Sequence, residues 1–131
     1  MGGLAGATAS AVLKVDNYDR ARRFYSEVLG LDVEDIPGDP TRQGVAKTDD
    51  GSTILLYERP GMPAPENTTL GFSVDDIDTA MDDLRSGGVE FEEYDIPEIG
   101  LKTEAGVASF GDMKIAWFKD SEGNILSLTT R

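Results

Sequence analysis

The side chains that could do chemistry in this chain are carboxylates, hydroxyls and a few aromatic rings. Of its 131 residues, 25 are Asp or Glu, and the chain contains neither histidine nor cysteine. Without cysteine there is no thiolate nucleophile, disulfide or iron–sulfur cluster. Without histidine the chain lacks the most common transition-metal ligand and the most common general base near neutral pH. A site made only of carboxylates for Mg²⁺ or Ca²⁺ stays open.

The acidic balance of the chain bears on its partners and location. The formal net charge is −13 and the sequence pI is about 4.2, so the clustered Lys and Arg that bind nucleic acid are missing. Such a field favours a cationic ligand, or it only keeps the protein soluble. No apolar run approaches the ~20 residues that span a bilayer, and MGGLAGATAS makes a poor signal peptide. We therefore expect a cytoplasmic protein with no membrane or nucleic-acid partner.

The sequence pattern of a strand followed by a helix, found near the N-terminus, is repeated later in the chain. Residues 10–15 alternate with period two, which predicts a strand. Asp16 and Asn17 can cap the helix that follows, its apolar stripe includes Ala21 and Tyr25, and Gly30 ends it. Shifted by 59 residues, a weaker copy of the pattern returns at residues 69–91. The chain therefore looks like two copies of one unit.

The rest of each copy reads as strands joined by turns. The further strands that we expect are residues 31–36, 43–48 and 53–58 in the first copy, and 89–94, 107–110, 114–118 and 124–130 in the second. Residues 95–106 form a longer excursion than the first copy has, and the proline-rich residues 59–67 form a linker. The predicted order is βαβββ, twice.

Three stretches carry a resemblance to a known family. They are VDNYDRARRFYSEVLGLDV (15–33), FSVDDIDTAMDDLRSGGV (72–89) and KIAWFKDSEGNILSLTT (114–130). Together they resemble the vicinal oxygen chelate superfamily, which includes glyoxalase I, extradiol dioxygenases and bleomycin-resistance proteins. The resemblance implies an α+β fold of two βαβββ modules, whose curved mixed sheets enclose a cavity and carry their helices outside. We expect a flexible N-terminus (1–9) and one domain (10–131), with modules at about 10–58 and 68–131.

In the metal-dependent members of that family, four inward positions hold the metal, usually through His, Glu or Gln. The motifs map these positions onto Ser10, Leu55, Thr69 and Ser127. None is a competent transition-metal ligand, and Glu58 lies an odd step from Leu55, so it points to the other face of its strand. We therefore expect no metal and no cofactor, while the catalytic residues, if any exist, stay unknown.

Strand alternation and the implied fold together predict a ligand-binding wall. Its members are small hydroxylic or apolar-aromatic side chains: Trp117, Tyr57, Leu55, Ile115, Met113, Ser10, Thr69, Ser127 and Val12. The glyoxalase family places an aromatic substrate contact at the position matching Trp117, although Trp117 could equally be a core residue. Lys14 among apolar neighbours suits a structural ion pair better than a ligand contact. The wall suits a flat or hydrophobic organic ligand.

Three functions remain open. The first is a metal-free protein that binds and sequesters a small hydrophobic or aromatic compound, such as an antibiotic. The second is a glyoxalase- or dioxygenase-like lyase, isomerase or oxygenase with an atypical or relocated metal site. The third is a scaffold or dimerisation module with no small-molecule ligand. The resemblance also implies a homodimer, because such modules commonly pair within or between chains to complete the cavity.

Overall fold

The first module of the protein is a four-stranded mixed sheet with one helix. The computed structural model describes residues 3–38 and 42–130. The elements of the module are β1 (Ala11–Val15), α1 (Tyr18–Arg23), a π-helical turn η1 (Phe24–Val28), β2 (Asp32–Ile36), β3 (Gln43–Lys47) and β4 (Thr53–Glu58). The strand order is β1-β4-β3-β2, with β1 parallel to β4 and the other pairs antiparallel.

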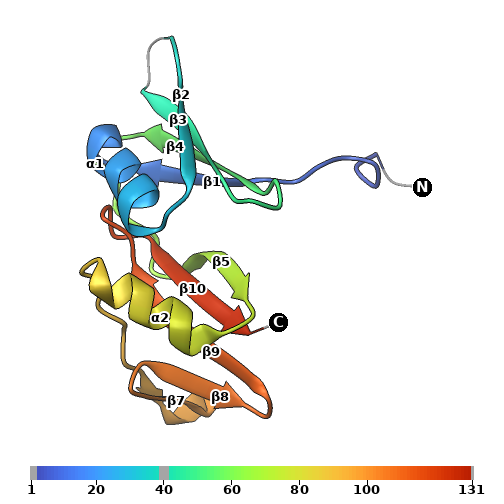
Figure 1. The fold of residues 1–131 in the computed structure, drawn as a ribbon, viewed down its shortest axis with the longest axis vertical. Coiled ribbons are helices and arrows are strands. Elements are labelled where there is room, and N and C mark those ends of the chain that lie inside the picture. Colours follow the sequence, from blue (N-terminus) through green and yellow to red (C-terminus); the bar gives the residue numbers. More distant parts are fainter. Residues whose placement is uncertain (1–2, 39–41, 131) are drawn as a thin grey trace.

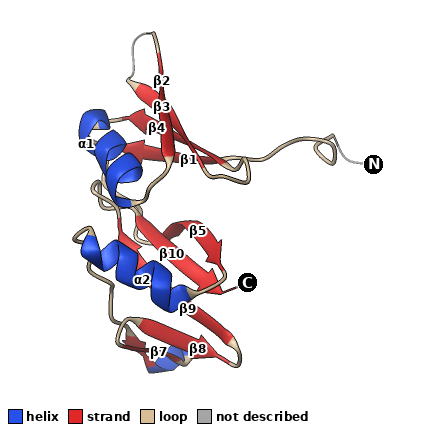
Figure 2. Ribbon diagram, viewed as in Figure 1, coloured by secondary structure: helices blue, strands red, loops and turns tan. Residues whose placement is uncertain are grey.

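The second module repeats this plan with a longer sheet. Its elements are β5 (Thr68–Val74), α2 (Ile77–Ser86), β6 (Asp95–Ile96), the 3₁₀ turn η2 (Pro97–Ile99), β7 (Leu101–Glu104), β8 (Val107–Phe110), β9 (Met113–Lys119) and β10 (Ile125–Thr130). The order is β5-β10-β9-β8-β7-β6, with β5 parallel to β10. Both long helices lie on one side of the molecule (Figures 1 and 2). The predicted α+β fold of two βαβββ-type modules with mixed sheets is confirmed.

One predicted strand, residues 89–94, is wrong. Only Phe91 pairs there, through an isolated bridge to Phe118. The edge of β9 that this segment would need is occupied, because β8 pairs with β9 from Met113 to Ala116. The expected excursion at residues 95–106 instead supplies β6 and β7, which extend the sheet beyond β8. The place beside residues 113–116 of β9 thus belongs to β8, and the predicted strand meets β9 only beyond it, at Phe118.

Each helix begins at a side-chain cap, and Asn17 was predicted for the first. The Asn17 side chain accepts a hydrogen bond from the Arg20 amide (3.0 Å), and the Asp76 side chain accepts one from the Thr79 amide (3.1 Å). Each cap satisfies a backbone N–H group that has no partner within the helix. The first helix does not stay α-helical over its whole length: it widens into η1, where the Leu29 amide bonds to the Phe24 carbonyl.

A single hydrophobic core runs through both modules. Its fully buried side chains come from the first module, such as Tyr25 and Leu56, and from the second, such as Met81, Phe118 and Leu126. Because apolar burial is the main favourable term in folding, the modules stabilise each other.

The turn between β9 and β10 ties the second module to the first helix. Glu122 is 6% exposed, and its carboxylate accepts hydrogen bonds from the amides of Asp16 (3.0 Å) and Asn17 (2.9 Å). Arg20 also binds it through Nε (2.7 Å) and Nη2 (2.9 Å). Burial alone would raise the pKa of the Glu122 carboxyl. The hydrogen bonds from Arg20, Ser121 and the Asn17 amide outweigh burial and lower that pKa.

A second polar link lies deeper in the same seam. The buried Tyr25 hydroxyl donates to Asp120 Oδ2 (2.7 Å). Asn124 Nδ2 donates both to Asp120 Oδ2 (3.0 Å) and to the Lys14 carbonyl (2.9 Å) on β1. No buried side-chain nitrogen or oxygen in residues 3–38 and 42–130 is left without a partner. The seam is therefore fully satisfied, as a buried polar network must be to stabilise a fold.

The chain before β1 projects away from both sheets (Figure 1). Residues 1–2 of the predicted flexible segment 1–9 lie outside the described residues. From Gly3 to Ser10 every side chain is exposed, and Leu4 is 82% exposed. Among the helices of the described ranges, none has the length and apolar character needed to cross a membrane.

Candidate functional site

The predicted site residues of the first module share the face of its sheet that lies away from α1. Val12 and Leu55 sit side by side in the β1–β4 register, and Tyr57 follows two residues later on the same face. Val12 is 58% exposed, whereas Leu55 and Tyr57 are half-buried. Glu58 points the other way, as alternation predicts, and accepts a hydrogen bond from the Tyr18 amide at the start of α1 (2.9 Å). At these positions of β1 and β4 the face is therefore apolar and aromatic. The residues paired with Leu55 are Val12 and Val45, and the Lys47–Glu34 ion pair lies farther out on β2 and β3.

Lys14 lies on the same strand but belongs to the structure rather than to the site. It is 8% exposed, and its Nζ forms an ion pair with Asp16 (3.0 Å). A buried ammonium needs such a partner, because an uncompensated charge is costly to bury.

The predicted site residues of the second module meet on the equivalent face of the second sheet. Ser127 pairs with Trp117, and Thr129 pairs with Ile115, across the β9–β10 ladder. Ser127 is buried, while Trp117 and Ile115 are half-buried. Met113, at the start of β9, is 41% exposed. Trp117 is therefore half-buried on a sheet face and is not a core tryptophan.

An aromatic residue that sequence reasoning missed contacts Trp117. The Tyr94 ring packs edge-on against Trp117, with centroids 5.4 Å apart and an interplanar angle of 77°. Thr103 holds Tyr94 in place: its Oγ1 accepts from the Tyr94 amide (2.8 Å), and its own amide donates to the Tyr94 carbonyl (2.9 Å). Burial, and to a smaller extent the charge of Glu92, raises the pKa of the Tyr94 hydroxyl. In the sequence, only its aromatic side chain pointed to Tyr94. The strand that positions it, β7, lies in residues 95–106, where no strand was predicted.

In the structure, the side chains at the four mapped metal-ligand positions are poorly suited to bind a transition metal. Thr69 Oγ1 donates to the Ile125 carbonyl (3.2 Å), Leu55 has no donor atom, and Ser127 is the neighbour of Trp117. Ser10 is exposed just before β1. Across the part of the chain that the structure describes, no group of three or more His, Cys, Asp or Glu side chains could hold a metal ion.

Ser10 is the one predicted site residue in the linings of four pockets that flank the sheets in residues 3–38 and 42–130. Its groove, of about 980 Å³, lies between the chain before β1, the turn from β3 to β4, and β5. The other predicted residues lie on the two open sheet faces. The structure thus brings Val12, Leu55 and Tyr57 together on one sheet, and Trp117, Ser127 and Ile115 on the other.

These features define a class of protein: paired modules with mixed sheets, helices on one side and a hydroxylic, aromatic surface on the other. The model of the Glyoxalase/Bleomycin resistance protein/Dioxygenase superfamily matches residues 9–128. The chain belongs to that superfamily.

Solved structures show the same fold at low sequence identity. UcmS2 is 20% identical with a TM-score of 0.72, and the match covers 96% of this chain and 98% of that one. TnmS3, an antibiotic binding protein from Streptomyces sp. CB03234, is 23% identical with a TM-score of 0.67 (95% and 97% covered). FosX from Listeria monocytogenes, a fosfomycin resistance protein solved with Mn(II) and sulfate, is 12% identical with a TM-score of 0.69 (98% and 94% covered). No curated protein matches in sequence.

Proposed function

We propose that this protein binds and sequesters a small hydrophobic or aromatic compound, such as an antibiotic, without using a metal. The main support for the proposal is the cluster formed by Trp117, Tyr94 and Ser127. The Trp117 ring is half-buried, Tyr94 packs against one edge, and the buried Ser127 lies beside it. Aromatic walls with a few hydroxyls bind flat organic molecules through apolar contact and orient them with single hydrogen bonds.

The chemistry of the four mapped positions supports binding over metal catalysis. A Lewis-acid mechanism needs an ion held by three or four good donors, and Ser10, Leu55, Thr69 and Ser127 offer none of the usual ones. TnmS3 is an antibiotic binding protein with this fold, which is consistent with such a use of it. The net charge of −13 favours a ligand that carries positive charge.

The proposed binding unit is a homodimer in the cytoplasm. A single chain leaves the apolar side chains of both sheet faces in solvent, with Val12 58% and Met113 41% exposed. A second copy would bury these side chains and turn two open faces into a closed site. Sedimentation velocity measures the mass directly, and a monomer at all concentrations would contradict this part of the proposal.

The direct test is a titration with a panel of cationic and neutral aromatic compounds. Trp117 is the single tryptophan, so its fluorescence reports on this site in the unmodified protein. Saturable quenching by one compound class is the expected result, and a flat response across the panel would refute the proposal.

Calorimetry then locates the site, since Trp117→Leu removes the fluorophore. We expect Trp117→Leu and Tyr94→Leu to raise the Kd of the compound by roughly two- to tenfold, because an aromatic contact of this kind contributes about 0.5–1.5 kcal/mol. The control is Lys114→Gln, which lies on the same strand but on the opposite face. Equal losses in all three variants would place the ligand elsewhere.

A further inference from the structure

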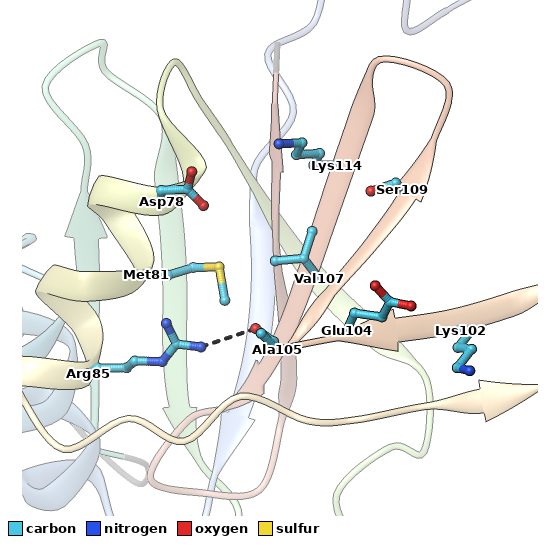
Figure 3. A pocket seen from close by; sticks show the side chains of 9 residues that line it. All are labelled: Asp78, Met81, Arg85, Lys102, Glu104, Ala105, Val107, Ser109 and Lys114. Carbon is cyan, nitrogen blue, oxygen red and sulfur yellow. Dashed lines mark hydrogen bonds between the residues drawn. The ribbon is translucent and has the colours of Figure 1, made fainter.

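A pocket separate from the groove at Ser10 lies on the helix side of the second module, on the opposite face of the sheet from Trp117. It has a volume of about 540 Å³ and opens between α2 and the β7–β8 hairpin, as Figure 3 shows. The sheet has six strands, and a helix of 10 residues does not cover all of them. Lys114 and Trp117 are three residues apart on β9, so they point to opposite faces.

The charge of this pocket is opposite to that of the protein. Its cations are Arg85, Lys102 and Lys114, against the acids Asp78 and Glu104, which leaves a formal sum of +1 in a chain of net charge −13. The linings of the other three pockets sum to zero or less.

Two of these cations, Lys102 and Lys114, form no ion pair within the described residues. Seven ion pairs occur in the described residues, and neither Lys102 nor Lys114 takes part in any of them. Twice as many acids as bases are present in the chain, yet no carboxylate oxygen of the described ranges lies within 4.0 Å of either ammonium group. Both side chains line the same pocket, Lys114 at one end and Lys102 at the other (Figure 3).

The floor between the cations is apolar. Met81 reaches from α2 toward the hairpin, and Val107 on β8 faces it (Figure 3). Lys114 stands above Val107 in this view, and the Arg85 guanidinium stands below Met81. A molecule with an anionic head and a short apolar chain would match this order of surfaces.

The wall of the pocket is held in a fixed position. Arg85 donates to the Ala105 carbonyl (3.2 Å), and its guanidinium lies 5.1 Å from the centre of the Phe91 ring. Ala105 has a φ of 51° and Gly106 a φ of 82°, and Ala105 is the one non-glycine residue in the described ranges with positive φ. Positive φ at both central residues is the geometry of a tight hairpin turn. A Cβ on Gly106 would lie 3.2 Å from the Met81 methyl, so the turn and the pocket floor are in contact.

We propose that this pocket binds a small organic carboxylate with a short apolar chain, at a site separate from the Trp117 face. The carboxylate lies against Lys114, whose ammonium N–H groups donate charge-assisted hydrogen bonds to it. The chain lies over Met81 and Val107.

The test uses the methyl groups of methionine as probes in NMR. The chain has four methionines; Met81 lines this pocket, whereas Met113 lies on the Trp117 face. Hexanoate titrated into the full-length protein should shift the Met81 methyl signal saturably and leave Met113 unchanged. Loss of the Met81 response would overturn this proposal without touching the proposed function, which Met113 and Trp117 report.

Two comparisons decide whether charge in this pocket is the cause. Lys114→Gln should raise the Kd for hexanoate by roughly two- to fivefold, as expected for one exposed ion pair. Lys119→Gln, on the same strand and the opposite face, changes net charge equally and should leave Kd unchanged. Hexylammonium should bind more weakly than hexanoate, although the net charge of the protein attracts it. Equal effects of the two lysine variants, or stronger binding of hexylammonium, would overturn the proposal.

Discussion

The hydrogen bond from Tyr25 to Asp120 offers a direct measure of how strongly the two modules are joined. Tyr25→Phe removes one hydroxyl from a fully buried ring and leaves the apolar contacts in place. Burial, the Asp120 charge and this hydrogen bond raise the pKa of the Tyr25 hydroxyl, so it remains a donor throughout the pH range in which the protein folds. The substitution therefore tests one bond, which spans 95 positions of the sequence.

The magnitude follows from what Asp120 retains. A hydrogen bond to a charged group contributes about 1.5–3 kcal/mol. Asp120 keeps the amides of Glu122 (2.8 Å) and Asn124 (2.9 Å) and the Asn124 side chain (3.0 Å), so the carboxylate is not left bare. We expect a loss at the lower end, about 1.5–2 kcal/mol, and a fall in Tm of roughly 5–10 °C for a domain of this size.

Urea denaturation measures the loss, with Tyr57→Phe as the matched control. Tyr57 is half-buried on β4, and its hydroxyl has no hydrogen bond to any other residue in the described ranges, so its loss should be below about 0.5 kcal/mol. If Tyr25→Phe costs no more than Tyr57→Phe, the seam does not depend on this bond. A single transition in both variants would also show that the modules unfold together.

Three further predictions concern pH, a turn and metal content. The pKa of Glu122 is lowered in the folded state, so this residue stabilises the fold above the unfolded value of about 4.3 and loses that effect as pH falls through its folded pKa. Glu122→Gln should therefore flatten the fall of the urea midpoint below about pH 4.3, and an unchanged slope would contradict the role of the carboxylate. Ala105→Gly should raise stability by about 0.5–1 kcal/mol because it relieves a left-handed alanine, whereas Gly106→Ala in the same turn should lower it by about 1–2 kcal/mol; effects of the same sign would refute the turn geometry. Elemental analysis of the purified protein should find far less than one equivalent of any transition metal, and a stoichiometric ion would overturn the mapping of the four ligand positions.

Alternation along the strands carried much of the reasoning about the candidate site. It predicted that Val12 and Leu55 share one sheet face and that Trp117 and Ser127 share another, and the strand registers agree. The basis is that side chains two residues apart on a strand point to the same side. It did not reveal which strands are neighbours: the segment at residues 89–94 has the composition of a strand, but β8 holds its place beside β9. Strand order depends on competition between segments, which a local pattern does not contain.

The buried hydrogen bonds that join Asp120, Glu122 and Asn124 to the first module could not be predicted from the sequence, for a similar reason. Asp120 and Glu122 sit in a turn that reads as an ordinary solvent-exposed connection, yet they are 6% exposed. Their partners lie between the end of β1 and η1, 95 to 106 positions earlier in the chain. Nothing in the residue types near Gly123 distinguishes a cap for a distant helix from a free carboxylate. Tyr94 was missed in the same way, because its contact with Trp117 depends on the position of Thr103.

The cap that Glu122 places on α1 has a consequence for how the chain is made. During synthesis, all of the first module emerges from the ribosome before residue 122 exists, so the amides of Asp16 and Asn17 wait for a partner from the last hairpin. Contacts between segments so far apart in sequence form late and slow folding. A nascent chain that ends at Glu58 therefore has every strand of its first sheet but lacks this cap, and reaches its final stability only when β10 is complete.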